Sequence, residues 1–250
     1  HYGGMPANMK KLREKFDRII IEDSCHALGA SYEGEKIGSC KYSDMSIFSF
    51  HPVKHITTGE GGMITTNNKD IYDKLLVLRN HGIDVSKKNV DEPWATPMIN
   101  LSHHYRTTDI QSALGISQLN KLEGFIKNAR KIAERYHQVF EKNSNMKIFK
   151  ENESQFNSYH LYPILVKDKK IRLELYNHLR KNNIFTQIHY QPVYLQPHYQ
   201  SLGYKKGLCP KAENFYDRVI SLPIYPQLTE EEQYFVIEKI NNFFGDENST

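Results

Sequence analysis

The sequence predicts a layered α/β protein organised in two parts. Helical and strand-like patterns alternate through the first half of the chain, a long run with helical spacing follows, and a second alternation fills the remainder. Alternation of this kind stacks helices against sheets. With 250 residues, 39% of them hydrophobic, the chain is long enough to bury a core in one large or two modest domains.

In the first half, apolar spacing of 3.6 residues predicts helices and short apolar runs predict strands. The expected helices cover residues 5–16 and 70–80, and the expected strands cover residues 18–22, 44–50 and 62–66. Residues 83–105 are polar and contain proline, so they predict a loop of the length that often carries function.

The middle of the chain opens with a capping box, Thr108 with Gln111, and its helical spacing continues to about residue 140. We expect one long helix, interrupted only at Gly115 and Gly124, that bridges two domains. Beyond it we expect strands at 158–166 and 184–189, a helix at 169–182 and a last helix after the capping box Thr229 to Glu232. The expected domains are residues 1–125 and 126–250.

Composition excludes several classes of protein. No apolar run approaches the length of a membrane span and the first ten residues do not form a signal peptide, so a cytoplasmic protein is expected. The net charge of +4 is dispersed, which argues against nucleic-acid binding but suits a small anionic substrate. The three cysteines, Cys25, Cys40 and Cys209, are too far apart for a metal motif and are expected to be buried free thiols.

Two segments carry residues with chemical potential. In residues 22–29, Asp23 and its neighbours stand where an apolar strand gives way to a loop, a usual place for ligand-binding groups, although such residues also simply cap or turn the chain. In residues 46–62, Lys54 follows an apolar strand, between His51 and His55. A lysine held near other cations and partly away from water can lose its proton and attack a carbonyl, but most lone lysines are solvated.

Taken together, these segments resemble the DegT/DnrJ/EryC1/StrS sugar aminotransferases. The signature of that family is an Asp-centred loop, then Ser-Phe-x-x-x-Lys and a Gly-Glu-Gly-Gly turn. The likeness runs the length of the chain, through Asn80-His81-Gly82, Tyr105-Arg106, residues 109–113, residues 160–163, residues 189–192 and Ser221-Leu222-Pro223. Agreement in order, spacing and residue type at this many places makes coincidence a poor explanation.

The resemblance implies the aspartate aminotransferase-like fold of pyridoxal-phosphate-dependent transferases, called fold type I, with part of the large domain followed by a small C-terminal α/β domain. It implies that Lys54 carries pyridoxal phosphate covalently and later moves a proton. Asp23 would pair with the ring nitrogen of the cofactor and His26 would approach its 3-hydroxyl. Cys25 would pack near the ring face, and Ser49 would bind the phosphate.

Two further residues and the assembly also follow from the resemblance. His104 stands where the family usually has an asparagine that reaches the cofactor phosphate of a neighbouring subunit, so this contact is in doubt. His189 matches a position near the sugar substrate, although a structural histidine is the alternative. The resemblance implies a homodimer with shared sites. The family also has an N-terminal portion without a counterpart here, so a longer protein is expected.

The function expected from the resemblance is transfer of an amino group, with glutamate as donor, to a keto group of a nucleotide-linked deoxysugar for glycan biosynthesis. The motifs are most similar to enzymes that aminate C4 of a UDP-4-keto-6-deoxy-N-acetyl sugar on the route to pseudaminic acid. One alternative is a sugar dehydratase of the same family, which uses pyridoxamine phosphate and has histidine in place of the lysine. The other is a non-catalytic relative, which the joint presence of Asp23, Ser49 and Lys54 disfavours.

Overall fold

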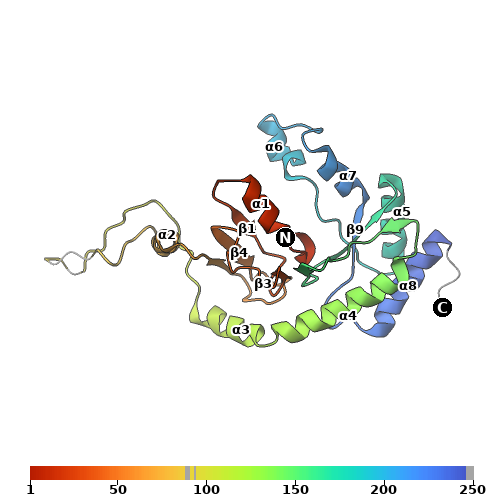
Figure 1. The fold of residues 1–250 in the computed structure, drawn as a ribbon, viewed down its shortest axis with the longest axis horizontal. Helices are drawn as coiled ribbons and strands as arrows, with labels where there is room; N and C mark the ends of the chain where they lie inside the picture. The colour runs from red at the N-terminus through yellow and green to blue at the C-terminus, as the bar shows by residue number, and fades with distance from the viewer. Residues whose placement is uncertain (88–90, 93, 246–250) are drawn as a thin grey trace. The chain divides into compact units, whose positions relative to one another are not determined.

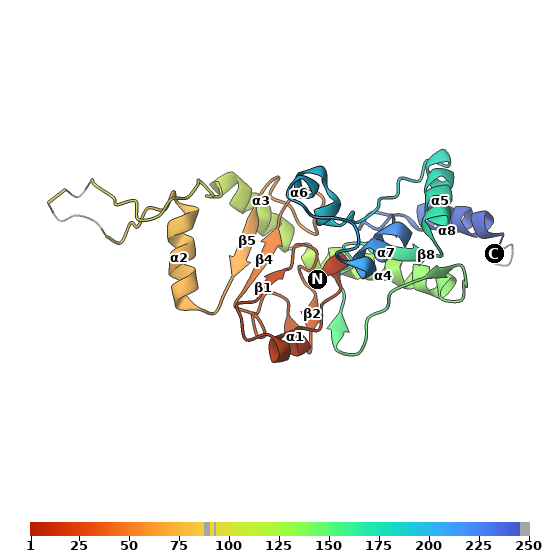
Figure 2. The same cartoon turned by 90° about the horizontal axis from the view of Figure 1, so that it is seen from above.

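A computed structural model describes residues 1–87, 91–92 and 94–245. The chain forms two compact units, shown as ribbons in Figures 1 and 2. The first unit is His1–Glu123 with Ser154–Phe156, and the second is Gly124–Glu153 with Asn157–Thr250. Within the described residues, no helix is both long enough and apolar enough to cross a membrane.

The first unit is built on two small sheets with helices beside them. Its elements are η1 (Tyr2–Gly4), α1 (Met9–Lys15), β1 (Ile21–Asp23), β2 (Ser31–Tyr32), β3 (Glu35–Lys36), β4 (Met45–Ser49), β5 (Gly62–Thr65), α2 (Lys69–Arg79), α3 (Asp109–Leu119) and β7 (Gln155–Phe156). One sheet has the order β1-β4-β5 and the other β3-β2-β7. The expected strands at 44–50 and 62–66 are confirmed with shorter bounds, and the strand expected at 18–22 begins later and extends one residue further, to Asp23.

The register of the first sheet brings two chemistry-bearing segments to one edge. Strands β1 and β4 are parallel, with Asp23 opposite Ile47, and β4 runs on to Ser49 before the chain leaves the sheet. Figure 2 shows β1, β4 and β5 side by side. The loops after β1 and β4 therefore emerge at the carboxyl edge, where open α/β sheets bind ligands.

Capping residues set the ends of the helices in this unit. The helix expected at 5–16 begins only at Met9, because the Asn8 side chain accepts a hydrogen bond from the Lys11 main-chain nitrogen, 3.0 Å away, and caps the first turn. Asn68 caps α2 in the same way. Between α2 and α3 the described residues contain no helix or strand, only the isolated bridges Asn80–His104 and Ile83–Met98, as expected for a long loop.

The single long helix expected after Thr108 is wrong in one respect, because the chain forms two helices, α3 and α4 (Leu122–Phe140), that part at Asn120. There the Lys121 main-chain nitrogen bonds to Gln118, three residues back, which tightens the last turn. Neither Gly115 nor Gly124 breaks a helix. A methyl group at Gly115 would lie 3.0 Å from Cγ2 of Thr58, so this glycine serves close packing in the first unit.

The second unit packs helices on an antiparallel sheet with the order β6-β8-β9. Its elements are most of α4, then β6 (Met146–Lys147), β8 (Tyr162–Val166), α5 (Lys169–Lys181), η2 (Val193–Leu195), α6 (Pro197–Ser201), α7 (Pro210–Arg218), β9 (Val219–Leu222) and α8 (Glu230–Phe244). On α4, Ile132, Tyr136 and Phe140 are buried at spacings of four residues and face the core of the unit.

The strand expected at 184–189 is wrong. Only Gln187 pairs, in an isolated bridge with Ser221 of β9. Ile184 and Thr186 are buried while Phe185 is 65% exposed, so the alternation in the sequence is real. Alternating burial against a core does not require a ladder of main-chain hydrogen bonds, and the sequence pattern reports only the burial.

The cysteines differ in exposure. Cys40 is buried and Cys25 is half-buried, but Cys209, which precedes α7, is exposed. The expectation of burial is therefore wrong for Cys209. Cys209 is the N-cap residue of α7, directly before Pro210.

Candidate active site

Lys54 lies in a loop, residues 50–61, that closes on itself at the end of β4. The main-chain nitrogen of Phe50 donates to Gly61, 2.9 Å away, and its carbonyl oxygen accepts from the main-chain nitrogen of Thr58 at 3.0 Å. Inside the loop, the Lys54 nitrogen donates to the His51 carbonyl oxygen at 2.9 Å, which makes a turn. Both ends of the loop are thus fixed, and the lysine is placed by a bonded main chain.

The Lys54 amine is half-buried and close to two acidic groups. Burial lowers its pKa below the ordinary lysine value, while the neighbouring Cys25 and Asp23 act in the opposite direction without cancelling the shift. A lowered pKa means that a larger fraction of the amine is unprotonated at neutral pH than in a solvated lysine. An unprotonated amine is the form that attacks a carbonyl carbon.

Asp23, the last residue of β1, keeps its negative charge. Burial acts to raise its pKa, but hydrogen bonds from Cys25 and nearby positive groups, His26 among them, outweigh burial and hold the pKa below its ordinary value. Its Oδ1 accepts from the Cys25 main-chain nitrogen at 3.1 Å. The site therefore pairs a carboxylate whose pKa is lowered, and which is ionised at neutral pH, with a lysine whose pKa is also lowered.

Cys25 is a poor nucleophile here. Burial, together with the Asp23 carboxylate, raises the pKa of its thiol to about 11. Its Sγ lies 3.9 Å from the carbonyl oxygen of Ile47 on β4. Because this pKa is well above neutral, the thiol stays uncharged. Only the thiolate reacts readily, so Cys25 is unreactive.

Ser49 and His26 add hydrogen-bonding groups to the same edge. The Ser49 hydroxyl oxygen accepts from the His51 main-chain nitrogen at 3.3 Å, and within the described part of the chain no acceptor takes its hydrogen. His26 Nδ1 accepts from the main-chain nitrogen of Gly3 at 3.3 Å. That bond places the ring hydrogen of a neutral His26 on Nε2, so both side chains can donate.

The structure does not join the two other candidate residues to this cluster. His104 is exposed; its main chain bridges Asn80 and its ring meets that of His81 edge to face, with centroids 5.2 Å apart. His189 belongs to the second unit, where its Nδ1 lies 2.9 Å from the hydroxyl of Ser221. Asp23, Cys25 and Lys54 are thus brought together within one unit, with His26 beside Asp23.

Sequence reasoning missed the residues that support the cluster. The side chain of Gln111, expected only to cap α3, also donates to the Glu60 carbonyl oxygen at 3.0 Å and so ties the helix to the lysine loop. The Thr58 hydroxyl donates to the same oxygen at 2.7 Å. No spacing signal links Gln111 with Glu60, because the two residues are 51 positions apart.

Comparison with known proteins places this geometry in context. Residues 1–241 match the sequence model of the DegT/DnrJ/EryC1/StrS aminotransferase family. A UDP-4-amino-4,6-dideoxy-N-acetyl-beta-L-altrosamine transaminase of Campylobacter jejuni (serotype O:23/36) is 38% identical over 240 residues, which is 94% of this chain and 62% of that protein.

Two solved structures match over nearly the whole chain. PseC of Helicobacter pylori, an aminotransferase involved in pseudoaminic acid biosynthesis, has a TM-score of 0.87 and 32% identity, covering 98% of this chain and 65% of that one. Spr1654 of Streptococcus pneumoniae, in its PLP form, has a TM-score of 0.84 and 28% identity, covering 97% and 66%. The chain thus spans less than two thirds of the length of these relatives.

The two glycines of the lysine loop give a test of its packing. Both have positive φ, +79° at Gly59 and +154° at Gly61, but a methyl group at Gly59 would meet nothing within 4 Å, whereas one at Gly61 would overlap the Thr58 hydroxyl. We expect Gly59→Ala to lower the free energy of unfolding by about 1 kcal/mol through backbone strain. Gly61→Ala should lower it by about 1–3 kcal/mol more. Denaturant titration measures both, and equal losses would contradict the packing described.

Proposed function

This chain belongs to the DegT/DnrJ/EryC1/StrS aminotransferase family, and from that premise we propose that the protein is a pyridoxal-phosphate-dependent aminotransferase acting on a nucleotide-linked keto sugar. The observation that carries the proposal is the half-buried Lys54 amine, with its lowered pKa, close to the Asp23 carboxylate. We further propose glutamate as the amino donor and C4 of a UDP-4-keto-6-deoxy-N-acetyl sugar as the acceptor. The transaminase of Campylobacter jejuni and PseC support this substrate class.

The groups at this edge of the sheet fit the demands of the cofactor. Its aldehyde requires an amine that can be unprotonated, and Lys54 provides one. Its ring nitrogen requires an anion, and Asp23 stays ionised. Its phosphate and 3-hydroxyl require donors, and the hydroxyl of Ser49 and Nε2 of His26 are groups of that kind. The PLP form of Spr1654 supports the same assignment.

When bound, pyridoxal phosphate supplies an electron-withdrawing ring and a carbon that takes up and passes on the amino group. The residues of the chain do the rest in this proposal. Lys54 would hold the cofactor through its unprotonated amine, and once the amino donor had released it, Nζ would hold and pass on a proton as a general base and acid. The Asp23 carboxylate would pair with the ring nitrogen and favour its protonated form. His189 of the second unit is proposed to contact the sugar.

The role of Lys54 can be tested by chemical labelling. Borohydride treatment of the full-length protein loaded with pyridoxal phosphate should fix the cofactor covalently on Lys54, and peptide mapping by mass spectrometry would locate it. Lys54→Ala should lose both the label and turnover. Lys69→Ala serves as the control, since the Lys69 side chain is 76% exposed in the same unit. A label on another lysine, or turnover unchanged in Lys54→Ala, would remove the central claim.

The electronic and positional roles can be separated by two substitutions. Asp23→Asn keeps the shape but removes the charge, so we expect the chemical step to slow by about 10²–10³-fold with little change in cofactor affinity. Ser49→Ala deletes one donor to a charged group, a loss of about 1.5–3 kcal/mol, which should weaken cofactor retention and be repaired by excess cofactor. Single-turnover rates and cofactor titrations measure both. Full rescue of Asp23→Asn by excess cofactor would contradict the assignment.

We also propose a homodimer in which each active site borrows from the neighbouring subunit. His104 stands on the exposed loop after α2 and is the candidate that crosses the boundary. Mixing Lys54→Ala subunits with His104→Ala subunits should restore part of the activity, because one of the two sites in a mixed dimer is then intact. Sedimentation velocity should show a dimer. An active monomer, or no recovery on mixing, would overturn the proposal of shared sites.

A further inference from the structure

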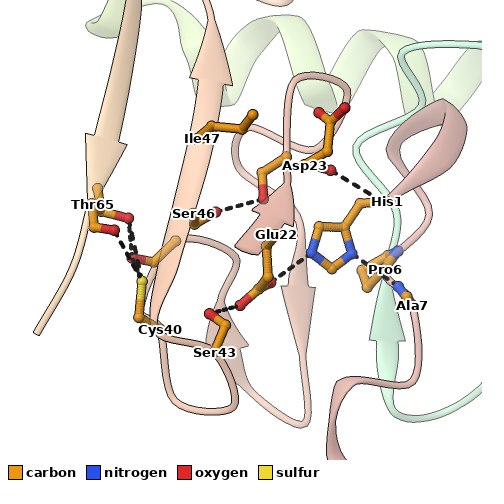
Figure 3. A network of polar contacts seen from close by, with 12 residues as sticks. His1, Pro6, Ala7, Glu22, Asp23, Cys40, Ser43, Ser46, Ile47 and Thr65 are labelled. Carbon is orange, nitrogen blue, oxygen red and sulfur yellow. Dashed lines mark hydrogen bonds and ion pairs between the residues drawn. The ribbon is translucent and has the colours of Figure 1, made fainter. Parts of the chain in front are cut away.

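Beneath the proposed cofactor edge, β1 carries a second acid that the mechanism does not use. Glu22 is 6% exposed, and its two carboxylate oxygens face His1 Nε2, 2.6 Å away, and the Ser43 hydroxyl, which donates to it. Figure 3 shows this network of dashed contacts around the carboxylate. Burying a carboxylate is costly unless its oxygens are satisfied, so these bonds are required wherever Glu22 stays ionised. Burial raises its pKa, with Ser43 partly opposing the shift.

His1 forms hydrogen bonds with both acidic residues of β1, one to a side chain and one to the main chain. Its Nδ1 accepts from the main-chain nitrogen of Ala7 at 3.0 Å, so in the neutral ring the hydrogen is on Nε2 and points to Glu22. The main-chain nitrogen of His1 donates to the carbonyl oxygen of Asp23 at 3.1 Å. His1 therefore forms hydrogen bonds with both the side chain of Glu22 and the main chain of Asp23, as Figure 3 shows.

The geometry of β1 explains how these hydrogen bonds orient the Asp23 carboxylate. Side chains alternate along a strand, so Glu22 points into the unit while Asp23 points to the site. Strand β1 has only three residues, and in the described residues its only strand partner is β4. Beyond Asp23, Ser24 donates its main-chain hydrogen to Ile47 at 2.9 Å. The peptide planes around Asp23 are thus fixed by β4 on one side and His1 on the other.

We propose that Glu22 and His1 are positioning residues: their buried hydrogen bond fixes the main chain at Asp23 and thereby aims its carboxylate. Neither residue touches the substrate or the cofactor, and each acts through Asp23. The expected effect on the reaction rate rests on the proposed function. The expected effect on the main chain at Asp23 does not. Partners that orient a ligand-holding group matter in this way in other sites, where their loss weakens binding or activity about 10–100-fold.

A matched control is available at the other end of the same strand. The Asp44 carboxylate accepts from Arg13 at 2.7 Å and from the main-chain nitrogen of Ile20 at 2.8 Å, just before β1. Asp44→Asn should therefore destabilise the first unit without loosening Asp23. A merely structural role for Glu22 predicts that Glu22→Gln and Asp44→Asn behave alike once their stabilities are compared.

The test uses the full-length protein with these two substitutions. We expect Glu22→Gln to lower the single-turnover rate about ten-fold with cofactor affinity little changed, as for a partner acting through Asp23, and Asp44→Asn to leave the rate near that of the wild type. In an Asp23→Asn background, Glu22→Gln should slow the reaction no further. Equal effects of Glu22→Gln and Asp44→Asn, or additivity with Asp23→Asn, would overturn the proposal.

A second readout needs no cofactor. The Cys25 main-chain hydrogen is bonded to Asp23 Oδ1, so its exchange with solvent reports how firmly the carboxylate is held. Exchange at Cys25 should speed up in Glu22→Gln and, more weakly, in Ser43→Ala, which removes one donor and is the milder variant if Glu22→Gln folds poorly. Unchanged exchange in both would refute positioning. A wild-type protein that fails to bind pyridoxal phosphate would instead refute the proposed function while leaving this measurement valid.

Discussion

The partial burial of the Lys54 amine beside an ionised Asp23 is the constraint around which the first unit is arranged. Burial alone would push the lysine toward its neutral form, and the adjacent carboxylate pulls it back toward the cation. The balance leaves an amine whose pKa is lowered while Asp23 remains charged. Such a balance depends on distance, so the supporting main chain must hold both residues. The parallel register of β1 and β4 sets their common edge.

The lysine loop is held from several directions because no single bond could fix a segment of twelve positions, residues 50–61. Phe50 closes the loop onto Gly61 and Thr58. From outside, Gln111 reaches the carbonyl oxygen of Glu60, and the glycine at position 115 lets α3 approach Thr58 closely. Each contact removes freedom that the folded loop would otherwise retain, and main-chain order is costly to obtain. The loop therefore depends on the helix that follows it by some fifty residues.

Sequence patterns correctly predicted the strands and helix starts that depend on the spacing of nearby residues. Apolar runs predicted β4 and β5, and capping boxes predicted the starts of α3 and α8. The motifs around Asp23 and Lys54 pointed to two residues that the structure places near each other. The failures share a cause. In the run at 184–189 burial alternates but only Gln187 pairs with another strand. At Asn120 the chain changes to a hydrogen bond between residues three positions apart. Neither feature changes the hydrophobic spacing. Likewise His1 and Glu22 meet across 21 positions, which no motif records.

Two adjacent acids on the short strand β1 have different tasks: Glu22 anchors the strand, and Asp23 faces the proposed ligand site. Glu22 and Asp23 are neighbours in sequence, yet their side chains point to opposite faces of the strand. Burial raises the pKa of Glu22, whereas hydrogen bonds from Cys25, together with nearby positive charge, lower the pKa of Asp23. A carboxylate at the site must stay exposed enough to meet a ligand, so it cannot anchor its own strand by burial. The buried acid beside it can. Glu22 and Asp23 are joined by a single planar peptide bond. The orientation of the Asp23 carboxylate therefore depends directly on how rigidly Glu22 is held.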